Sequence, residues 1–404
     1  MIENEQKPEK IILVGVSTDD ADIDISLDEL AELVKTAGGE VVGRISQNLD
    51  YANNKTYVGS GKLDEIKEFL GILEADGICC DDELSPVQMR NLNDYLGCKV
   101  MDRTMVILDI FAQRARSHEG KIQVELAQMQ YRAAKLIGLG KQMSRTGGGI
   151  GTRGPGEKKL EIDRRRIHDR ISLLKQDVKE VAKHRETSRK SRKRNEKKVA
   201  AIVGYTNAGK STLLNTLTNA DILSEDMLFA TLDPTTRVLD LSNNQEILLT
   251  DTVGFISKLP HNLIDAFKST LEEAVYADII IHVVDASDPE YDLKMKIVYE
   301  TLNSLKVENK PIITLFNKCD KLDREEILVD RKADKYMRIS AVTGQGLEEF
   351  KETLRNFLRV NKEYKTIRLP FSESGKLYEI KKNAEIVNEK YTEEGIELTG
   401  YFSK

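Results

Sequence analysis

A glycine-rich stretch followed by lysine and serine, "GYTNAGKS" at residues 204–211, is the part of this 404-residue sequence best suited to chemistry. An apolar run precedes it and an amphipathic run follows it, which is the strand, loop and helix order of a phosphate-binding loop. Gly204 and Gly209 allow backbone N–H groups to point at phosphate oxygens, and the helix N-terminus adds its dipole. The residues between the two glycines are expected nucleotide contacts: Tyr205, Thr206, Asn207 and Ala208.

The two residues that end this loop have separate expected roles. Lys210 would reach the β- and γ-phosphates of a nucleotide, and Ser211 would ligate Mg²⁺. An ordinary glycine-rich turn explains neither residue, so the sequence predicts a nucleoside triphosphate site.

A second signature, Asp251-Thr252-Val253-Gly254, follows another apolar run about forty residues later. Asp251 at a strand end suits a carboxylate that holds Mg²⁺ through water, and the Gly254 N–H suits a contact to the γ-phosphate. The next residue is Phe255, where many switch GTPases have a glutamine that orients the attacking water. A phenyl ring cannot hydrogen-bond to water, so we expect slow intrinsic hydrolysis and a partner, a cation or another segment that positions the water.

The segment "MLFATLDPTTR" at 227–237 is expected to hold the switch threonine that closes over Mg²⁺ and the γ-phosphate. Thr231, Thr235 and Thr236 are the candidates, and Thr231 is preferred because Pro234 follows it as a loop stiffener. Thr231 would then act in catalysis and in metal binding. The other expected nucleotide contacts of this segment are Phe229, Ala230, Leu232 and Asp233.

Two later motifs select the base. In "NKCD", the Asp320 carboxylate can accept from N1–H and the 2-amino group of guanine, which adenine does not offer. Asn317 would hold the O6 or N7 edge indirectly, and Lys318 would lie along the face of the base. Cys319 completes this motif. In "RISAVTGQG", three residues would pack on the base and offer an N–H to O6: Ser340, Ala341 and Val342.

The elements that must position these residues form an α/β protein with four segments. Residues 1–117 alternate between apolar runs and helical patterns, which predicts a small domain with a parallel sheet. Its strands are expected at 10–16, 40–45, 76–80 and 98–102, with helices at 26–37, 61–75 and 85–97. "YVGSGK" at 57–62 resembles a phosphate loop, but Thr56 stands where the first glycine is needed, so we interpret it as a turn that opens a helix.

Residues 118–198 predict an antiparallel helical hairpin, because apolar residues recur at spacings of four and three in two stretches. The second helix could reach roughly 50 Å if it runs to about residue 194. A loop at 138–159 with eight glycines joins the two stretches. Residues 158–198 hold 17 Lys and Arg against 7 Asp and Glu, on a chain of net charge −6. We favour contact with RNA over an idle linker, because cations neutralise phosphates and glycines allow close approach.

The remaining segments are a P-loop GTPase domain at 199–361 and a small α/β domain at 364–404. The latter is expected to contain a strand at "TIRLPF", a helix at 374–391 and a strand at "GIELTGYF". No apolar stretch has the length of a membrane span and the N-terminus does not resemble a signal peptide, so a cytoplasmic protein is expected. We also expect a monomer. The four cysteines lack C-x-x-C spacing, which favours buried thiols over a zinc site.

The chain resembles the HflX family of translational GTPases, within the Obg-HflX group. The resemblance is carried by "GYTNAGKSTLLN", "FATLDPTTR", "DTVGFISKLP", "NKCD" and "SA", and outside the nucleotide site by "VMDRTMVILDIFAQRARSHEGKIQVELAQMQYRAAKL" and "GGGIGTRGPGEKKLEIDRRRI". It implies an N-terminal α/β domain, a helical linker and a G domain. It also implies GTP as substrate, Mg²⁺, binding to the large ribosomal subunit, splitting of stalled or idle ribosomes under stress, and hydrolysis stimulated by the ribosome.

Two other functions remain open from the residues alone. One is a regulatory module in which GTP gates association with a protein partner and RNA plays no part. The other is an RNA-remodelling enzyme that uses nucleotide at the N-terminal domain, for which "YVGSGK" is the only support. Binding through many phosphates would weaken steeply with salt, which separates an RNA partner from a protein partner.

Overall fold

The computed structural model describes residues 7–18, 23–137, 155–194, 198–218, 228–229, 232–241, 245–260, 271–322, 327–360 and 362–403. The chain divides into two units. The first comprises Met1–Ala182 together with Met227–Leu232 and Lys258–Phe267, and the second comprises the remaining residues. Within the described ranges, no helix combines the length and the apolar character that crossing a bilayer requires.

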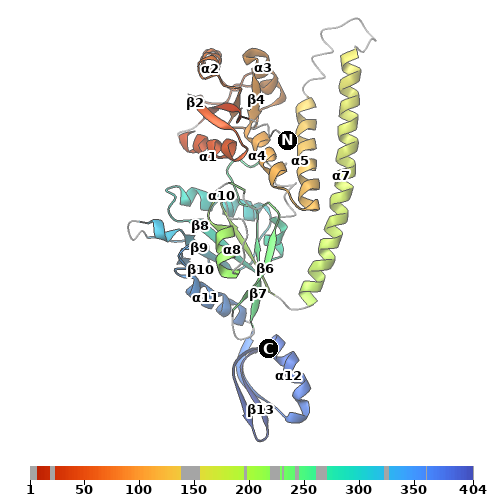
Figure 1. Ribbon diagram of the computed structural model, residues 1–404, viewed down its shortest axis with the longest axis vertical. Helices are drawn as coiled ribbons and strands as arrows, with labels where there is room; N and C mark the ends of the chain where they lie inside the picture. The colour runs from red at the N-terminus through yellow and green to blue at the C-terminus, as the bar shows by residue number, and fades with distance from the viewer. Residues whose placement is uncertain are drawn as a thin grey trace, which may run out of the picture. The chain divides into compact units, whose positions relative to one another are not determined.

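The N-terminal sheet of the first unit has four parallel strands in the order β2-β1-β3-β4 (Figure 1). The strands are β1 (Lys10–Ser17), β2 (Glu40–Asn48), β3 (Gly77–Cys80) and β4 (Lys99–Asp102). The helices are α1 (Ile23–Thr36), α2 (Ser60–Ile72), α3 (Pro86–Leu96) and α4 (Arg103–Arg114). Side chains of α2 and α3 pack with alternate residues of β1, including Ile12 and Val14, because successive strand residues face opposite sides.

The predicted strands and the first three helices of this sheet are therefore confirmed, while α4 adds a helix that the sequence did not indicate. The turn at "YVGSGK" opens α2 as expected. Gly59 is the N-cap of that helix, and Tyr57 precedes it in a left-handed conformation with a φ of 66°.

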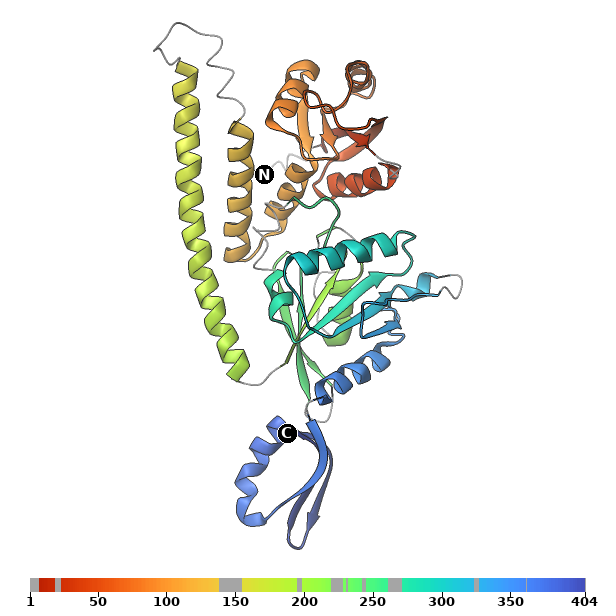
Figure 2. The same cartoon turned by 180° about the vertical axis from the view of Figure 1, so that it is seen from behind.

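Two long helices form the predicted hairpin, α5 (His118–Ile137) and α7 (Pro155–Arg194) (Figures 1 and 2). Apolar residues of both helices pack in one seam, which includes Ile122, Leu126, Ile171 and Leu174. Arg170 of α7 also forms a two-pronged ion pair with Glu125 of α5, at 2.7 and 2.8 Å. Residues 138–154 of the predicted glycine-rich loop lie outside the described residues.

The second unit contains a six-stranded sheet in the order β10-β9-β8-β5-β7-β6, in which only the β6–β7 pair is antiparallel. The strands are β5 (Lys198–Gly204), β6 (Thr235–Asp240), β7 (Glu246–Asp251), β8 (Ile279–Asp285), β9 (Ile312–Asn317) and β10 (Lys335–Arg338). The helices are α8 (Lys210–Thr218), α10 (Tyr291–Ser304) and α11 (Leu347–Arg359), with a short 3-10 turn η1 (Cys319–Lys321).

Alternation along β8 divides these helices between the two faces of the sheet. Ile281 and Val283 pack with α8 and α11, whereas Val284 packs with α10. The strands are buried on both sides and therefore consist of almost continuous apolar runs. The carboxyl ends of β5, β7 and β9 lead into three of the predicted nucleotide motifs.

The C-terminal segment is a three-stranded antiparallel sheet in the order β11-β13-β12 with helix α12. Its elements are β11 (Lys362–Leu369), the 3-10 turn η2 (Phe371–Lys376), α12 (Leu377–Asn383), β12 (Glu385–Thr392) and β13 (Gly395–Ser403). The prediction of a helix over residues 374–391 was wrong, because helix α12 ends at Asn383 and strand β12 follows it. The pairing of β12 with β13 along its length overrides the helical preference of its Glu and Lys residues.

Candidate nucleotide-binding site

The loop between β5 and α8 has the backbone of a phosphate cradle. Gly204 has a φ of 158°, and a Cβ at this position would lie 2.2 Å from the carbonyl oxygen of Val283. Gly209 has a φ of 92°, and a Cβ there would lie 2.3 Å from Nδ2 of Asn317. The two glycines are therefore required by close approach, and at Gly209 also by a left-handed conformation.

Lys210 begins α8 and is held across the loop, because its ammonium donates to the carbonyl oxygen of Tyr205 at 2.7 Å. Burial lowers the pKa of Lys210 to about 8, although the carboxylate of Asp251 acts in the opposite direction. A polyphosphate would supply the negative charge that favours the protonated form. The lysine is thus placed as the sequence predicted for a phosphate contact.

Ser211 and Asp251 meet beside this lysine, with Oγ of Ser211 donating to Oδ2 of Asp251 at 2.9 Å. A hydroxyl and a carboxylate are hard oxygen ligands that fit Mg²⁺, which usually takes one or two protein ligands and completes its shell with water and phosphate. The described residues contain no cluster of three or more His, Cys, Asp or Glu that could hold a metal ion by itself. The pair fits a metal shared with a nucleotide.

The Asp-Thr-Val-Gly signature packs directly against the loop. Thr252 is fully buried and donates to the carbonyl oxygen of Ile202 at 2.7 Å, so its side chain stabilises the strand. Val253 is also buried. A Cβ at Gly254 would lie 2.9 Å from both Nζ of Lys210 and Cα of Thr206, so only glycine fits at this point.

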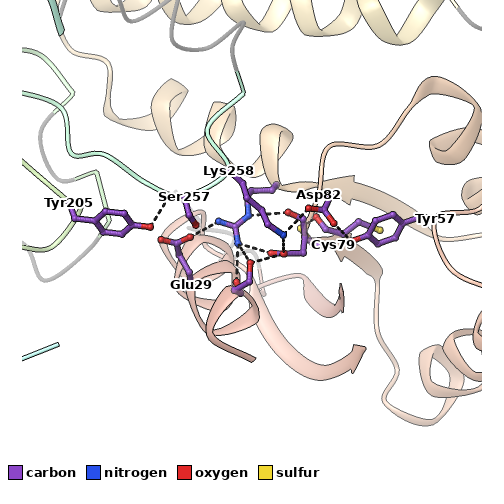
Figure 3. A network of polar contacts seen from close by, with 11 residues as sticks. Glu29, Tyr57, Cys79, Asp82, Tyr205, Ser257 and Lys258 are labelled. Carbon is purple, nitrogen blue, oxygen red and sulfur yellow. Dashed lines mark hydrogen bonds and ion pairs between the residues drawn. The ribbon is translucent and has the colours of Figure 1, made fainter. Parts of the chain in front are cut away.

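Phe255 is bound to the loop by its backbone. Its N–H donates to Gly204 at 3.1 Å and its carbonyl accepts from Thr206 at 2.8 Å, which forms a bridge beside Tyr205. The hydroxyl of Tyr205 accepts the N–H of Ser257 at 2.7 Å (Figure 3). The ring of Phe255 is 2% exposed, so in this conformation it lies in the core.

Asn317 connects the phosphate loop with the second base motif. Its Nδ2 donates to the carbonyl of Ala208 at 2.9 Å, and its Oδ1 accepts the N–H of Ala341 at 2.9 Å. Thr216 of α8 donates to the carbonyl of Ala341 at 2.8 Å. The sequence predicted a role for Asn317 at the base edge, whereas here the side chain fastens the elements that surround the base site.

The other base-motif residues differ in exposure. Lys318 has a φ of 62° and its ammonium pairs with Asp285 at 2.7 Å. Asp320 is exposed on η1, while Cys319 donates its thiol to the carbonyl of Phe316 at 3.2 Å. In the last motif, Ser340 is buried and Val342 is 77% exposed. Asp285 lies 33 residues before Lys318, and no local pattern indicated that it holds the lysine.

The predicted switch segment is described only in part. Ala230 and Thr231 lie outside the described residues, as do their contacts. Phe229 and Leu232 are buried, with 3% of each residue exposed, and Asp233 is partly buried. The other two candidates, Thr235 and Thr236, both lie in β6, where the Thr236 hydroxyl pairs with that of Thr250 at 3.0 Å.

A buried histidine lies in the strand beside β5 and was not indicated by the sequence. His282 of β8 is 1% exposed, 4.0 Å from the Asp330 carboxylate, and packs edge-on against the ring of Tyr299. Asp330 accepts hydrogen bonds from Tyr299 and Thr314, both at 2.6 Å. Burial lowers the pKa of His282 to about 4, against the opposing effect of Asp330.

Comparison with protein families gives three matches in chain order. Residues 24–112 match the GTP-binding GTPase N-terminal family, residues 114–192 match its middle region, and residues 199–318 match the 50S ribosome-binding GTPase family. Together the matched ranges cover most of the chain.

Curated relatives match almost the whole length. The chain is 58% identical to GTPase HflX of Lacrimispora saccharolytica, over 99% of this chain and 95% of the relative. It is 47% identical to GTPase HflX of Caldanaerobacter subterraneus, over 96% and 90% of the two chains. It is 42% identical to GTPase HflX of Escherichia coli, over 90% and 86%.

Proposed function

Because the chain belongs to the GTPase HflX family and is a GTPase, we propose that it binds the large ribosomal subunit under control of GTP and acts as a stress-related ribosome splitting or recycling factor. The observation that carries this proposal is the pairing of a complete guanine-nucleotide motif set with a long helical hairpin of positive charge. The name of the matched family, 50S ribosome-binding GTPase, supports the coarser statement of ribosome association.

In the proposed site, Lys210 and the Gly254 N–H bind the γ-phosphate, and their fixed positions support this role. The lysine is tied to Tyr205, and Gly254 lies against the loop. Both groups would stabilise charge on the transferred phosphoryl group. Mg²⁺ would neutralise phosphate charge, with Ser211 as a direct ligand, Asp251 through water, and Thr231 as the switch ligand.

Hydrolysis is proposed to be slow without the ribosome. The ring of Phe255 is buried and has no hydrogen-bonding group, so it cannot orient water. The chain would then rely on a ribosomal group to position the water, which raises the rate only when the complex has formed.

The proposed RNA contact uses the cationic hairpin. The segment 158–198 has a net charge of +10. Exposed cations on its described helix include Arg165, Arg166, Lys175, Lys179 and Lys183. Such a surface would neutralise phosphates of ribosomal RNA, and the chain would act as a monomer on the large subunit.

Co-sedimentation with separated ribosomal subunits tests this proposal. The full chain is expected to pellet with the large subunit when a non-hydrolysable GTP analogue is present, and less with GDP or no nucleotide. Binding should weaken steeply with salt, and Lys175→Glu and Lys179→Glu should each reduce it further than the matched single reversal Lys365→Glu on β11. Binding that depends on the nucleotide but ignores the salt would support a GTP-gated module for a protein partner instead, and binding that ignores the nucleotide would contradict the proposal.

Splitting is a separate measurement. Addition of the chain with GTP to intact ribosomes is expected to increase free subunits in a sucrose gradient, together with at least a tenfold rise in phosphate release over the isolated chain. Binding without an increase in free subunits would support ribosome association and contradict the splitting role.

A further inference from the structure

An acidic pair, Asp81 and Asp82, lies directly after β3 in the first unit and receives a lysine from a distant part of the sequence. Nζ of Lys258 lies 2.8 Å from Oδ1 of Asp82 and also forms an ion pair with Oδ2 of Asp81 (Figure 3). Lys258 comes four residues after Gly254 of the nucleotide signature. The chain between them therefore links a predicted γ-phosphate contact to the acidic pair.

The acidic pair is itself held rigidly. Asp81 is fully buried and its carboxylate contacts the Arg103 guanidinium at 2.6 Å and the Ser26 hydroxyl at 2.7 Å. Burial acts to raise the pKa of Asp81, but the charges of Arg103 and Lys258 hold it below its ordinary value. Asp82 accepts the hydroxyl of the buried Tyr57 at 2.6 Å. The carboxylates thus form a fixed docking point for the lysine.

A second contact involves the predicted switch segment. The ring of Phe229 lies edge-on against the ring of Phe111 on α4, with centroids 4.7 Å apart and an interplanar angle of 74°. Phe229 is 3% exposed and Phe111 is 1% exposed, so this is a desolvated aromatic contact. Phe229 precedes the preferred switch threonine, Thr231, by two residues.

Backbone strain coincides with these contacts. Lys258 has a φ of 53° and Phe229 has a φ of 55°, a left-handed conformation that is unfavourable for residues with large side chains. Tyr57, which holds Asp82, has a φ of 66°. Such conformations persist where surrounding contacts hold them in place, and they are frequent in switch regions. Strain at Lys258 and Phe229 would be relieved if the two contacts were released.

The residues between Gly254 and Lys258 form a short connection that backbone hydrogen bonds hold in place. Phe255 is bridged to the phosphate loop and the Ser257 N–H is bound to the Tyr205 hydroxyl, which leaves only Ile256 between these two fastened positions. A shift of Gly254 toward a γ-phosphate would therefore pull on this connection and on Lys258.

We propose that residues 1–117 sense the third phosphate of the bound nucleotide through the Lys258–acidic pair contact and the Phe229–Phe111 contact, both of which are formed without that phosphate and released with it. The inference rests on the proposed nucleotide site and adds to it the residues that report the state of that site. Asp82, Lys258, Phe111 and Phe229 are positioning residues, since none of them needs to touch the reacting atoms.

A fluorescence measurement tests the aromatic contact. The chain has no tryptophan, so Phe229→Trp introduces a single reporter beside Phe111. With GDP the emission is expected to match a buried ring, and with a non-hydrolysable GTP analogue and Mg²⁺ it should shift to longer wavelength. Phe371→Trp on the half-exposed η2 turn is the matched reporter that should not respond. Identical Phe229→Trp emission in the two nucleotide states would overturn the proposal.

Charge removal tests the ionic contact by calorimetry. Lys258→Met and Asp82→Asn should each raise the affinity for the GTP analogue relative to GDP by about three- to tenfold, because the state without the third phosphate loses a contact. The double variant should change this affinity ratio by less than the product of the single changes, since each substitution removes the same Lys258–Asp82 ion pair. Lys99→Met, which removes an exposed pair with Glu9, is the control. Ratios equal to the control would overturn the proposal.

Loss of folding and failure of the nucleotide site give different results from failure of this inference. Heat unfolding identifies a variant that does not fold, and the reporter then carries the test alone. If the unsubstituted chain binds neither GDP nor the analogue, the proposed function fails. If it binds both and the reporter is silent, the nucleotide site stands and the sensing contacts do not.

Discussion

Asn317 accepts the backbone N–H of Ala341 at 2.9 Å while its amide donates to the carbonyl of Ala208 at the same distance, so one side chain joins the phosphate loop to the base motif. Its replacement would leave two buried backbone groups without these partners. The bridge thus links folding of the domain to the shape of the nucleotide site.

Asn317→Ala is expected to lower the free energy of unfolding by about 2 kcal/mol, because buried polar groups lose their hydrogen bonds. Affinity for GDP should fall by at least about tenfold, since the loop and the base motif are no longer held together. Denaturant unfolding and calorimetry measure the two effects. Asn303→Ala on the exposed side of α10 should change neither. Lower stability with unchanged affinity would mean that the bridge is only structural.

Gly209→Ala and Gly61→Ala distinguish the two glycine-rich loops. At Gly209 a Cβ would lie 2.3 Å from Asn317 and the φ is 92°, so we expect loss of measurable guanine-nucleotide binding. Gly61 lies in α2 with nothing within 4 Å of a Cβ, so alanine should stabilise the helix by up to about 1 kcal/mol. Calorimetry of Gly61→Ala should give unchanged nucleotide affinity. Weaker nucleotide binding by Gly61→Ala would indicate that "YVGSGK" takes part in a nucleotide site.

Asp320→Asn tests the base selector. The carboxylate is exposed on η1, so the substitution should leave the unfolding temperature unchanged. Affinity for GDP should drop by about two to three orders of magnitude, because an amide cannot accept two donors from guanine. Xanthosine diphosphate, whose base offers an acceptor in place of the 2-amino group, should bind the variant better than it binds the unsubstituted chain. Equal preference for guanine in Asp320→Asn and in the unsubstituted chain would show that another residue selects the base.

His282 makes stability depend on acid. Its folded-state pKa of about 4 lies below the ordinary value of 6.5, so the unfolded chain binds a proton that the folded chain refuses. The stabilising contribution is complete above pH 6.5, declines as pH falls from 6.5 to 4, and amounts to about 3 kcal/mol. The pKa of Asp330 is also lowered, against the effect of its burial, by hydrogen bonds from Thr314 and Tyr299, which acts in the same direction.

Unfolding of a His282→Gln variant across this pH range checks that prediction. Between pH 4 and 6.5, the slope of the unfolding free energy against pH should be smaller in the variant by the equivalent of about one proton, whatever the overall stability of the variant. His168→Gln on the exposed face of α7 should keep the original slope. An unchanged slope in His282→Gln would assign the acid sensitivity to carboxylates alone.

The fold was predictable where one local pattern decided the structure. Apolar runs such as "KIILVGV" and "VAAIV" became buried parallel strands, because a strand covered on both faces needs no polar alternation. The segment at 374–391 failed because its Glu and Lys residues favour a helix, whereas pairing with β13 decides the structure of Glu385–Thr392. The helix α4 was missed because seven of its residues are buried on several sides, which hides a helical period.

The site was predictable where chemistry is concentrated in a contiguous motif. Gly204, Lys210, Ser211 and Asp251 come together as the loop pattern requires, although their roles toward nucleotide stay predictions. The partners that hold the motifs were not predictable, since Asp285 and the acidic pair come from remote positions without a signature. Long-range pairing depends on the fold, and a single sequence contains no direct record of it.

Helix α7 has 40 residues, which at 1.5 Å per residue corresponds to a rod of about 60 Å. In a rod of this length a small rotation produces a large displacement, because rotation by 5° about one end moves the other end by about 5 Å. Displacements of a few tenths of an ångström close to the pivot would therefore be enough to move the far tip by more than the width of a side chain.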